Sequence, residues 1–229
     1  MMKTFLKPAL AAGIALAALS APAAAQVNGM AMMRAPVAIA QSQALLNAFQ
    51  AIDTANAAQI TQIGQLAQQR AQLLQAIDTN GNGQLEELDT NGDGNLDQAE
   101  QTANPSVTQA AGLEQQINTL QQPIQLAQLY VVTQVAEQAG PAAQQVVTER
   151  NVSVLIEPEA VRYAAQGFDI TPLVVTALNT RFPTAQTTVP AGWQPTDEGA
   201  INLYQQVLQV LQALAARQQA AAAPAAEGR

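Results

Sequence analysis

Large apolar residues recur at alternating three- and four-residue steps along two long stretches of the chain. The first stripe runs through Phe49, Ile52, Ile63, Leu66, Leu73 and Ile77, and the second through Leu113, Ile117, Leu120, Ile124, Ala127 and Val131. This spacing is typical of helices that pack along one seam, although Asn56, Gln59 and Arg70 interrupt the first stripe. The pattern predicts two long helices, over residues 42–77 and 106–139.

Proline and glycine modify the second of these helices. Pro123 is expected to kink it and Gly140-Pro141 to break it, with a helical segment resuming over residues 142–150. Both predicted helices are about 50 Å long at ~1.5 Å per residue. We therefore expect them to fold back as an antiparallel hairpin, residues 42–149, with an insertion at its tip, residues 78–104. Two helices with one seam bury little, so this hairpin needs partner chains or a compact base.

Short β-branched runs on both sides of the hairpin predict such a base. Residues 37–40, 152–156 and 160–164 are expected to be strands, and Thr171-Pro172 to open a short helix with Thr171 as its N-cap. Residues 36–41 and 150–182 are therefore assigned to a β body with an antiparallel sheet. The expected fold class is α+β, predominantly α.

The remaining segments flank this body. Residues 26–35, which include three methionines, are expected to be flexible, and residues 183–196 to form a linker. An apolar stripe predicts a C-terminal helix over residues 197–219, followed by a disordered tail, residues 220–229. The stripe consists of Ile201, Tyr204, Leu208, Leu211 and Leu214. This helix could pack on the body or associate with its own copies around a three-fold axis. Packing is favoured because an exposed stripe of that length would aggregate.

Residues 1–25 have the three parts of a secretory signal. Lys3 and Lys7 precede an apolar run that is too short to span a bilayer, and small residues follow at the expected cleavage site near Ala25. The mature chain is therefore expected to be exported and is not expected to span a membrane. The alternative is an N-terminal membrane anchor.

Composition excludes several classes of protein. The 229 residues include 48 Ala and 34 Gln but no His and no Cys, which excludes a thiol nucleophile, an imidazole base, a zinc finger and a disulfide framework. Without the two signal lysines, 7 Arg oppose 17 acids, a balance of 7 − 17 = −10. Residues 71–149 carry ten acids and no base, so we do not expect nucleic-acid binding.

The tip insertion carries two overlapping matches to the oxygen-ligand spacing of an EF-hand loop. The candidate metal ligands are Asp78, Asn80, Asn82, Gln84, Glu86 and Asp89 in the first loop, and Asp89, Asn91, Asp93, Asn95, Asp97 and Glu100 in the second. Because the loops share Asp89 instead of being separated by helices, they are not a true EF-hand pair. Ca²⁺ is the expected cofactor, and the fold of the body is not expected to require it. The alternative is an ordinary Asn/Gly/Asp turn that joins two helices.

Two stretches of the chain resemble the Skp/OmpH family of periplasmic chaperones. They are VAIAQSQALLN, residues 37–47, and NVSVLIEPEAVRYAAQGFDITPLVVTALNTRF, residues 151–182, and the order of elements between them is also similar. The resemblance implies a homotrimer in which short strands form a central body and three helical arms enclose a cavity for unfolded outer-membrane proteins, without ATP. It implies no catalytic residues. The acidic, Gln-rich arms, the tip insertion and the C-terminal helix depart from the better-known members.

Two functions follow from these features. The first is an ATP-independent holdase for unfolded outer-membrane proteins, and the second is a calcium-responsive structural or interaction module of the cell envelope. An enzyme is the weakest alternative, because the sequence shows no nucleophile–base pair and no cofactor loop.

Overall fold

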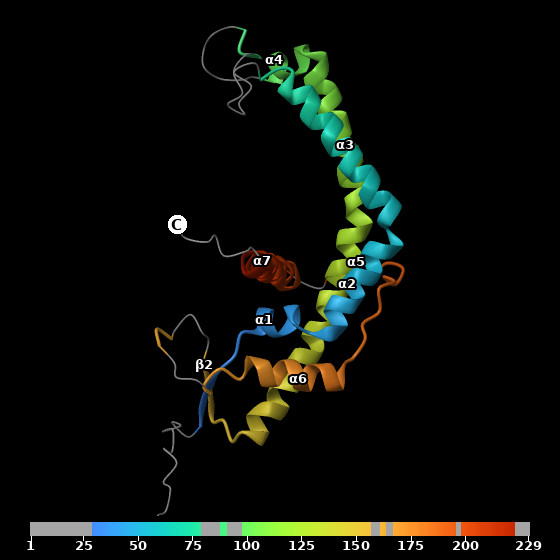
Figure 1. Ribbon diagram of the computed structural model, residues 1–229. Helices are drawn as coiled ribbons and strands as arrows, with labels where there is room; N and C mark the ends of the chain where they lie inside the picture. The colour runs from blue at the N-terminus through green and yellow to red at the C-terminus, as the bar shows by residue number, and fades with distance from the viewer. Residues whose placement is uncertain are drawn as a thin grey trace, which may run out of the picture.

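The structure is a computed structural model that describes residues 29–78, 88–90, 98–156, 161–163, 167–195 and 198–222. These residues form a long curved arm on a smaller base, with a separate helix across the arm (Figure 1). The elements, in chain order, are β1 (Met30–Met32), α1 (Ala35–Ala40), α2 (Gln43–Ala55), α3 (Ala57–Gln75), α4 (Gln98–Ala103), α5 (Pro105–Glu149), β2 (Val154–Ile156), α6 (Thr171–Arg181) and α7 (Glu198–Ala222).

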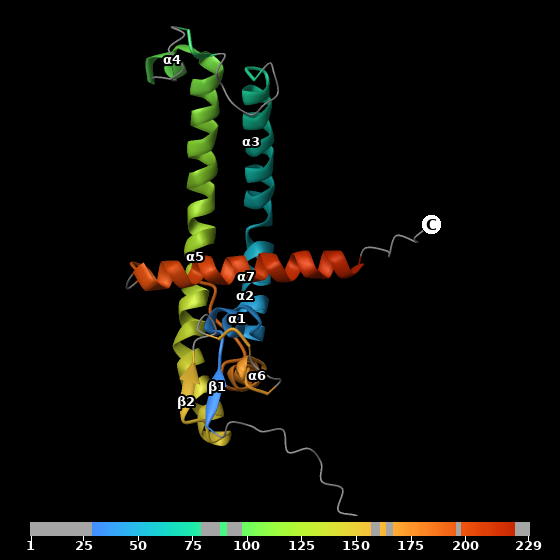
Figure 2. The same ribbon diagram turned by 90° about the vertical axis from the view of Figure 1, so that its left-hand side faces the viewer.

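The arm consists of α2 and α3 on one side and α5 on the other, lying side by side in both views (Figures 1 and 2). Gln59 donates to the main-chain carbonyl of Leu120, and Arg70 pairs with Glu114 at 3.0 Å. As residue numbers rise along α3 they fall along α5, so these helices run in opposite directions. The seam positions Ile63 and Leu66 of α3 are half-buried against α5, but no residue of α3 is fully buried.

The predicted helix over residues 42–77 is interrupted once, at Asn56. This residue has φ −107° and ψ 18°, outside helical geometry, and it separates α2 from α3. Its side-chain amide donates to the carbonyl of Ile52 at 2.7 Å and so competes with the helical hydrogen-bond pattern. Gln59 and Leu120 are joined by a hydrogen bond, so stepping three residues along each chain places Asn56 opposite Pro123.

The expected break at Gly140-Pro141 is wrong, because α5 continues through it as one helix to Glu149. Pro123 and Pro141 both lie inside α5, and each removes one main-chain donor at a cost of about 3 kcal/mol. Around Pro141 this cost is offset by burial, since Ala139, Ala142 and Val146 are all buried in the base. Tertiary packing therefore overrides the local preference of the proline.

The sheet differs from the expected one in direction and in membership. β1 and β2 pair in parallel, with Met30 opposite Val154 and Met32 opposite Ile156, whereas an antiparallel sheet was expected. Residues 30–32 were expected to be flexible but supply β1. Residues 161–163 are not in a strand, and the large side chain of Tyr163 is 86% exposed there.

The expected strand at residues 37–40 is also wrong, because these residues belong to helix α1. Pro36 lies in its first turn, a position that proline tolerates, and alanine favours the helical state. Ala38, Ile39 and Ala40 are all buried, since α1 packs against α5, α6 and α7. The apparent alternation of Val37 and Ile39 is therefore compatible with a short helix enclosed by others.

The hydrophobic core lies at the base of the arm. Its fully buried members include Ile39 in α1, Leu45 in α2, Val131, Val132 and Val135 in α5, Val174 and Leu178 in α6, and Val207 in α7. Higher on the arm, α5 has no buried residue between Leu113 and Ile124. The middle of α5 is therefore little buried, whereas Ala110 and Leu113 are buried again nearer the tip.

The C-terminal segment extends further as a helix than expected. The predicted helix over residues 197–219 corresponds to α7, which continues through residues 220–222. Residues 220–222 had been assigned to the disordered tail, and the rest of that tail lies outside the described residues. The predicted signal, residues 1–25, and residues 26–28 also lie outside the described residues. Like these, residue 196 of the linker falls outside the described ranges.

Candidate functional site

Helix α7 lies across the concave face of the arm, nearly perpendicular to α5 (Figures 1 and 2). Tyr204 is 7% exposed, and its hydroxyl lies 2.8 Å from the side-chain carbonyl Oε1 of Gln128 on α5, to which it donates. One turn further, Val207 is fully buried. Burial raises the pKa of the Tyr204 hydroxyl, because the phenolate would lose its hydration. The first half of α7 is therefore docked on the arm, whereas residues 215–221 are exposed.

The linker between α6 and α7 is held on α5 by two contacts. The side-chain amide of Gln134 donates to the carbonyl of Gln186 at 2.9 Å and accepts from the N–H of the same residue at 3.0 Å. The ring of Trp193 meets the ring of Tyr130 nearly edge-on, with centroids 4.9 Å apart and planes at 67°. Such aromatic contacts are favourable beyond the area they bury. The linker is thus bound along α5 through one main-chain contact and one ring contact.

Apolar side chains are exposed around the two-stranded sheet. Val154 and Leu155 on β2 are 49% and 47% exposed, and Met30 on β1 is 39% exposed. A cavity of about 250 Å³ lies beside them, lined by Met32, Ile156, Val161, Tyr163 and Phe168 among others. Parallel strands are usually covered on both faces, so this surface is unusual for a protein that acts as a single chain.

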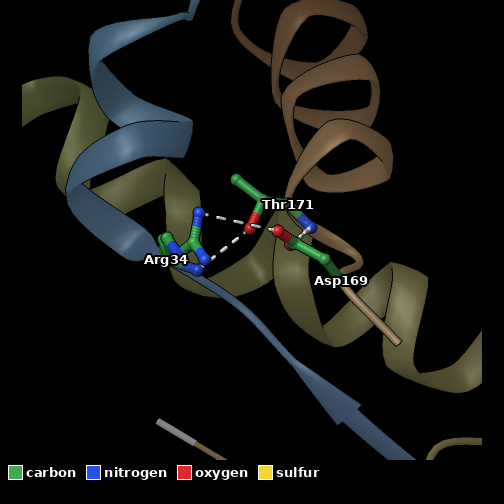
Figure 3. A network of polar contacts seen from close by, with 3 residues as sticks. All are labelled: Arg34, Asp169 and Thr171. Atoms are coloured by element: carbon green, nitrogen blue, oxygen red, sulfur yellow. Dashed lines mark hydrogen bonds and ion pairs between the residues drawn. The ribbon is translucent and has the colours of Figure 1, made fainter. Parts of the chain in front are cut away.

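Three residues join β1 to the start of α6 (Figure 3). The N–H of Arg34 donates to the hydroxyl of Thr171 at 3.0 Å, and the guanidinium of Arg34 lies 4.0 Å from the Asp169 carboxylate. Asp169 also accepts from the N–H of Thr171 at 2.9 Å. The side chain of Asp169, two residues before Thr171, therefore provides an acceptor for the first N–H of α6. The expected N-cap, Thr171, is instead the first residue of this helix.

At the tip of the arm, the structure describes three of the candidate metal ligands, Asp78, Asp89 and Glu100. Glu100, at the start of α4, is 8% exposed, and its Oε1 accepts from the N–H and the hydroxyl of Thr90 at 2.8 Å and 3.0 Å. These bonds connect the second and twelfth positions of the second loop, so they bring its two ends together.

The other candidate ligands lie outside the described residues. They are Asn80, Asn82, Gln84, Glu86, Asn91, Asp93, Asn95 and Asp97. Within the ranges that the structure does describe, no three acidic side chains gather as a metal site would require. The calcium prediction therefore remains a prediction.

A protein-family model described as outer membrane protein (OmpH-like) matches residues 36–178, more than half of the chain. The chain belongs to the OmpH-like family. Members of this family are periplasmic chaperones and not enzymes. Among the described helices of this OmpH-like chain, none is both long and apolar enough to cross a membrane.

One solved structure is similar to this OmpH-like chain. It is a candidate outer-membrane chaperone, also OmpH-like, from Caulobacter crescentus, with 23% sequence identity and a TM-score of 0.42. The match covers 70% of this chain and 89% of that one. A search of the curated proteins finds no match.

The contacts that hold the C-terminal segment were not predicted from the sequence. Tyr204 belonged to the expected apolar stripe of the last helix, but its partner Gln128 is one of 34 glutamines and carries no distinguishing pattern. Gln134 was missed for the same reason. The position of Tyr130, one helical turn before Gln134, is the one signal that could have drawn attention to this face of α5.

Proposed function

We propose that this OmpH-like chain is a periplasmic, ATP-independent holdase that acts as a homotrimer and binds unfolded outer-membrane proteins between its arms. The observation that carries the proposal is the pairing of a thin two-helix arm with a small parallel sheet, to which the described residues contribute two strands and a single bridge between Met32 and Asp169. Such a small parallel sheet is not stable alone in water, and its apolar side chains are exposed here. Further copies of the chain would supply both the missing cover and the other arms.

Client binding would then depend on enclosure. The arm has little buried surface of its own between its tip and its base, so its side chains remain available to an enclosed polypeptide. Many weak contacts inside a confined volume act together, because the effective concentration of each contact is high once the first has formed. Family membership supports a chaperone role of this kind.

The self-association can be tested with a pair of matched substitutions. Leu155→Asp places a charge on the exposed face of β2, and Ile60→Asp places the same charge on α3, at a residue of similar exposure, 40% against 47%. We expect light scattering to show a trimer for the wild type and for Ile60→Asp, and a monomer for Leu155→Asp. The wild type should also suppress the aggregation of an unfolded β-barrel protein at about one trimer per client. A monomeric wild type that does not suppress aggregation would refute the proposal.

A second candidate function is a calcium-responsive module at the arm tip, and the closed ends of the second loop favour it. The Thr90–Glu100 hydrogen bonds hold Thr90, the residue after Asp89, beside the carboxylate of Glu100 and so draw the two ends of the second loop together. Carboxylate and amide oxygens in this spacing suit Ca²⁺, which would stiffen the tip when bound.

The calcium proposal is tested by thermal denaturation with and without Ca²⁺. Millimolar Ca²⁺ should raise the Tm of the wild type and should not raise that of Asp89→Ala, which removes the ligand shared by the two loops. Glu114→Gln, which removes an acid on the arm outside the motif, should respond as the wild type does. A wild-type Tm that is insensitive to Ca²⁺ would exclude this function and leave the holdase proposal intact.

A further inference from the structure

The linker after α6 and helix α7 lie beyond the residues that the family model matches. The family match ends at residue 178, and the chain then continues along α5 and across the concave face of the arm. Most contacts of this segment are made with α5 and α1, which belong to the matched region. A surface formed by the residues that the family model matches is thus covered by a segment outside that match.

The linker is bound as an extended chain. Ala185, Thr187 and Val189 are half-buried, whereas the residues between them are exposed, so alternate side chains face the protein. The chain then turns, with the N–H of Trp193 donating to the carbonyl of Pro190 at 3.0 Å and Gly192 at φ +77°. The turn brings the Trp193 ring to Tyr130.

The hydrogen bonds of Gln134 do not depend on the type of residue that it contacts. Both of its hydrogen bonds go to the main chain of Gln186, one as donor and one as acceptor, as a neighbouring β-strand would make them. Tyr130 and Gln134 are four residues apart on α5 and therefore share one face. Together they present a main-chain contact and an aromatic contact to an extended polypeptide.

We propose that Tyr130 and Gln134 form a binding site for extended polypeptide segments that carry an aromatic side chain, and that residues 183–195 are its built-in occupant. This inference rests on the proposed holdase function and names the chemistry of the client. The strands of outer-membrane barrels alternate apolar and polar side chains and carry girdles of aromatic residues. The occupant shows a similar alternation in burial over residues 185–189 and supplies one aromatic ring, Trp193. A client segment would displace the linker, and α7 opposes this by anchoring the end of the linker through Tyr204 and Val207.

The chain contains a single tryptophan, so Trp193 reports on the occupant directly. The full-length protein is titrated with a tryptophan-free synthetic peptide of alternating Tyr/Leu and Ser/Thr residues. We expect the Trp193 emission to shift to the red as the ring leaves Tyr130 for water. Because Gln134 holds the linker, Gln134→Leu should shift the Trp193 emission to the red even without peptide, whereas Gln144→Leu, the same change at an exposed position of α5, should leave the emission unchanged.

A reversible cross-link between α1 and α7 provides the second part of the test. Val37 and Val210 line one groove between α1 and α7, and the chain has no cysteine, so a double Val37→Cys/Val210→Cys variant can be bridged by a reducible bis-thiol reagent. The bridged protein should bind the peptide at least tenfold more weakly, and reduction should restore binding. Peptide binding without a Trp193 shift, equal affinity in the bridged protein, or an unshifted Trp193 emission in Gln134→Leu would overturn the inference. Because aggregation suppression is measured separately, these outcomes are distinct from a failure of the proposed function.

Discussion

Two adjacent leucines of α2 allow a direct test of where the stability of the protein resides. Leu45 is fully buried in the base, whereas Leu46 is 46% exposed. Replacing Leu45 by Ala removes three carbon atoms from the core, a loss of about 2.4 kcal/mol at about 0.8 kcal/mol for each buried methylene. The cavity left behind adds to this, so we expect Leu45→Ala to lower the free energy of unfolding by about 3–4 kcal/mol.

Leu46→Ala is the matched control. It makes the same chemical change in the same helix, so the difference in helix propensity between Leu and Ala is common to both variants. Its expected cost is below about 1 kcal/mol, since much of the Leu46 side chain is already in water. Urea denaturation followed by far-ultraviolet circular dichroism measures both values, at one protomer concentration because self-association adds to apparent stability. Equal losses in the two variants would refute the assignment of the core to this face of α2.

Three further predictions concern polar groups. Asp169→Ala should lower the free energy of unfolding by about 1 kcal/mol through loss of the hydrogen bond to the first N–H of α6, and Asp169→Asn by less because an acceptor remains, as measured by urea denaturation. Arg70→Ala should cost at most about 1 kcal/mol, and this cost should fall in high salt, because both partners of the Arg70–Glu114 pair are more than a third exposed. The raised pKa of Tyr204 means that its contribution to stability is complete below the unfolded value near 10 and is lost as pH rises through the higher folded pKa. The decline in unfolding free energy above about pH 10 should therefore be shallower in Tyr204→Phe, and an identical decline would contradict the assignment.

The long helices could be predicted from the sequence because their apolar spacing is a local signal. The seam residues of both stripes, such as Ile63 and Ile124, lie where two helices meet. The base was harder to predict, because its elements are short and their state depends on what surrounds them. Residues 37–40 form a helix because three other helices enclose them, and no pattern within four residues carries that information.

The candidate functional residues also include some that local sequence can predict and some that it cannot. The spacing of oxygen ligands at the tip is a sequence motif and could be proposed without a structure. The contacts of Gln134 and Tyr130 with the linker join residues more than fifty positions apart, between a common amide and an ordinary main chain. Only the folded arrangement brings these groups together, so periodicity and composition could not reveal them.

The interruption at Asn56 and the proline opposite it on α5 have a mechanical consequence. If only one helix of a pair were weakened, the intact helix would keep the pair straight. Here both helices are weakened at the same level along the arm, so the part of the arm beyond this level can bend as a unit. That upper part acts as a lever: α3 is about 28 Å long at ~1.5 Å per residue, and a rotation of ~10° at the joint displaces its far end by about 5 Å. A small local adjustment can therefore widen or narrow the space beside the arm without disturbing the packed base.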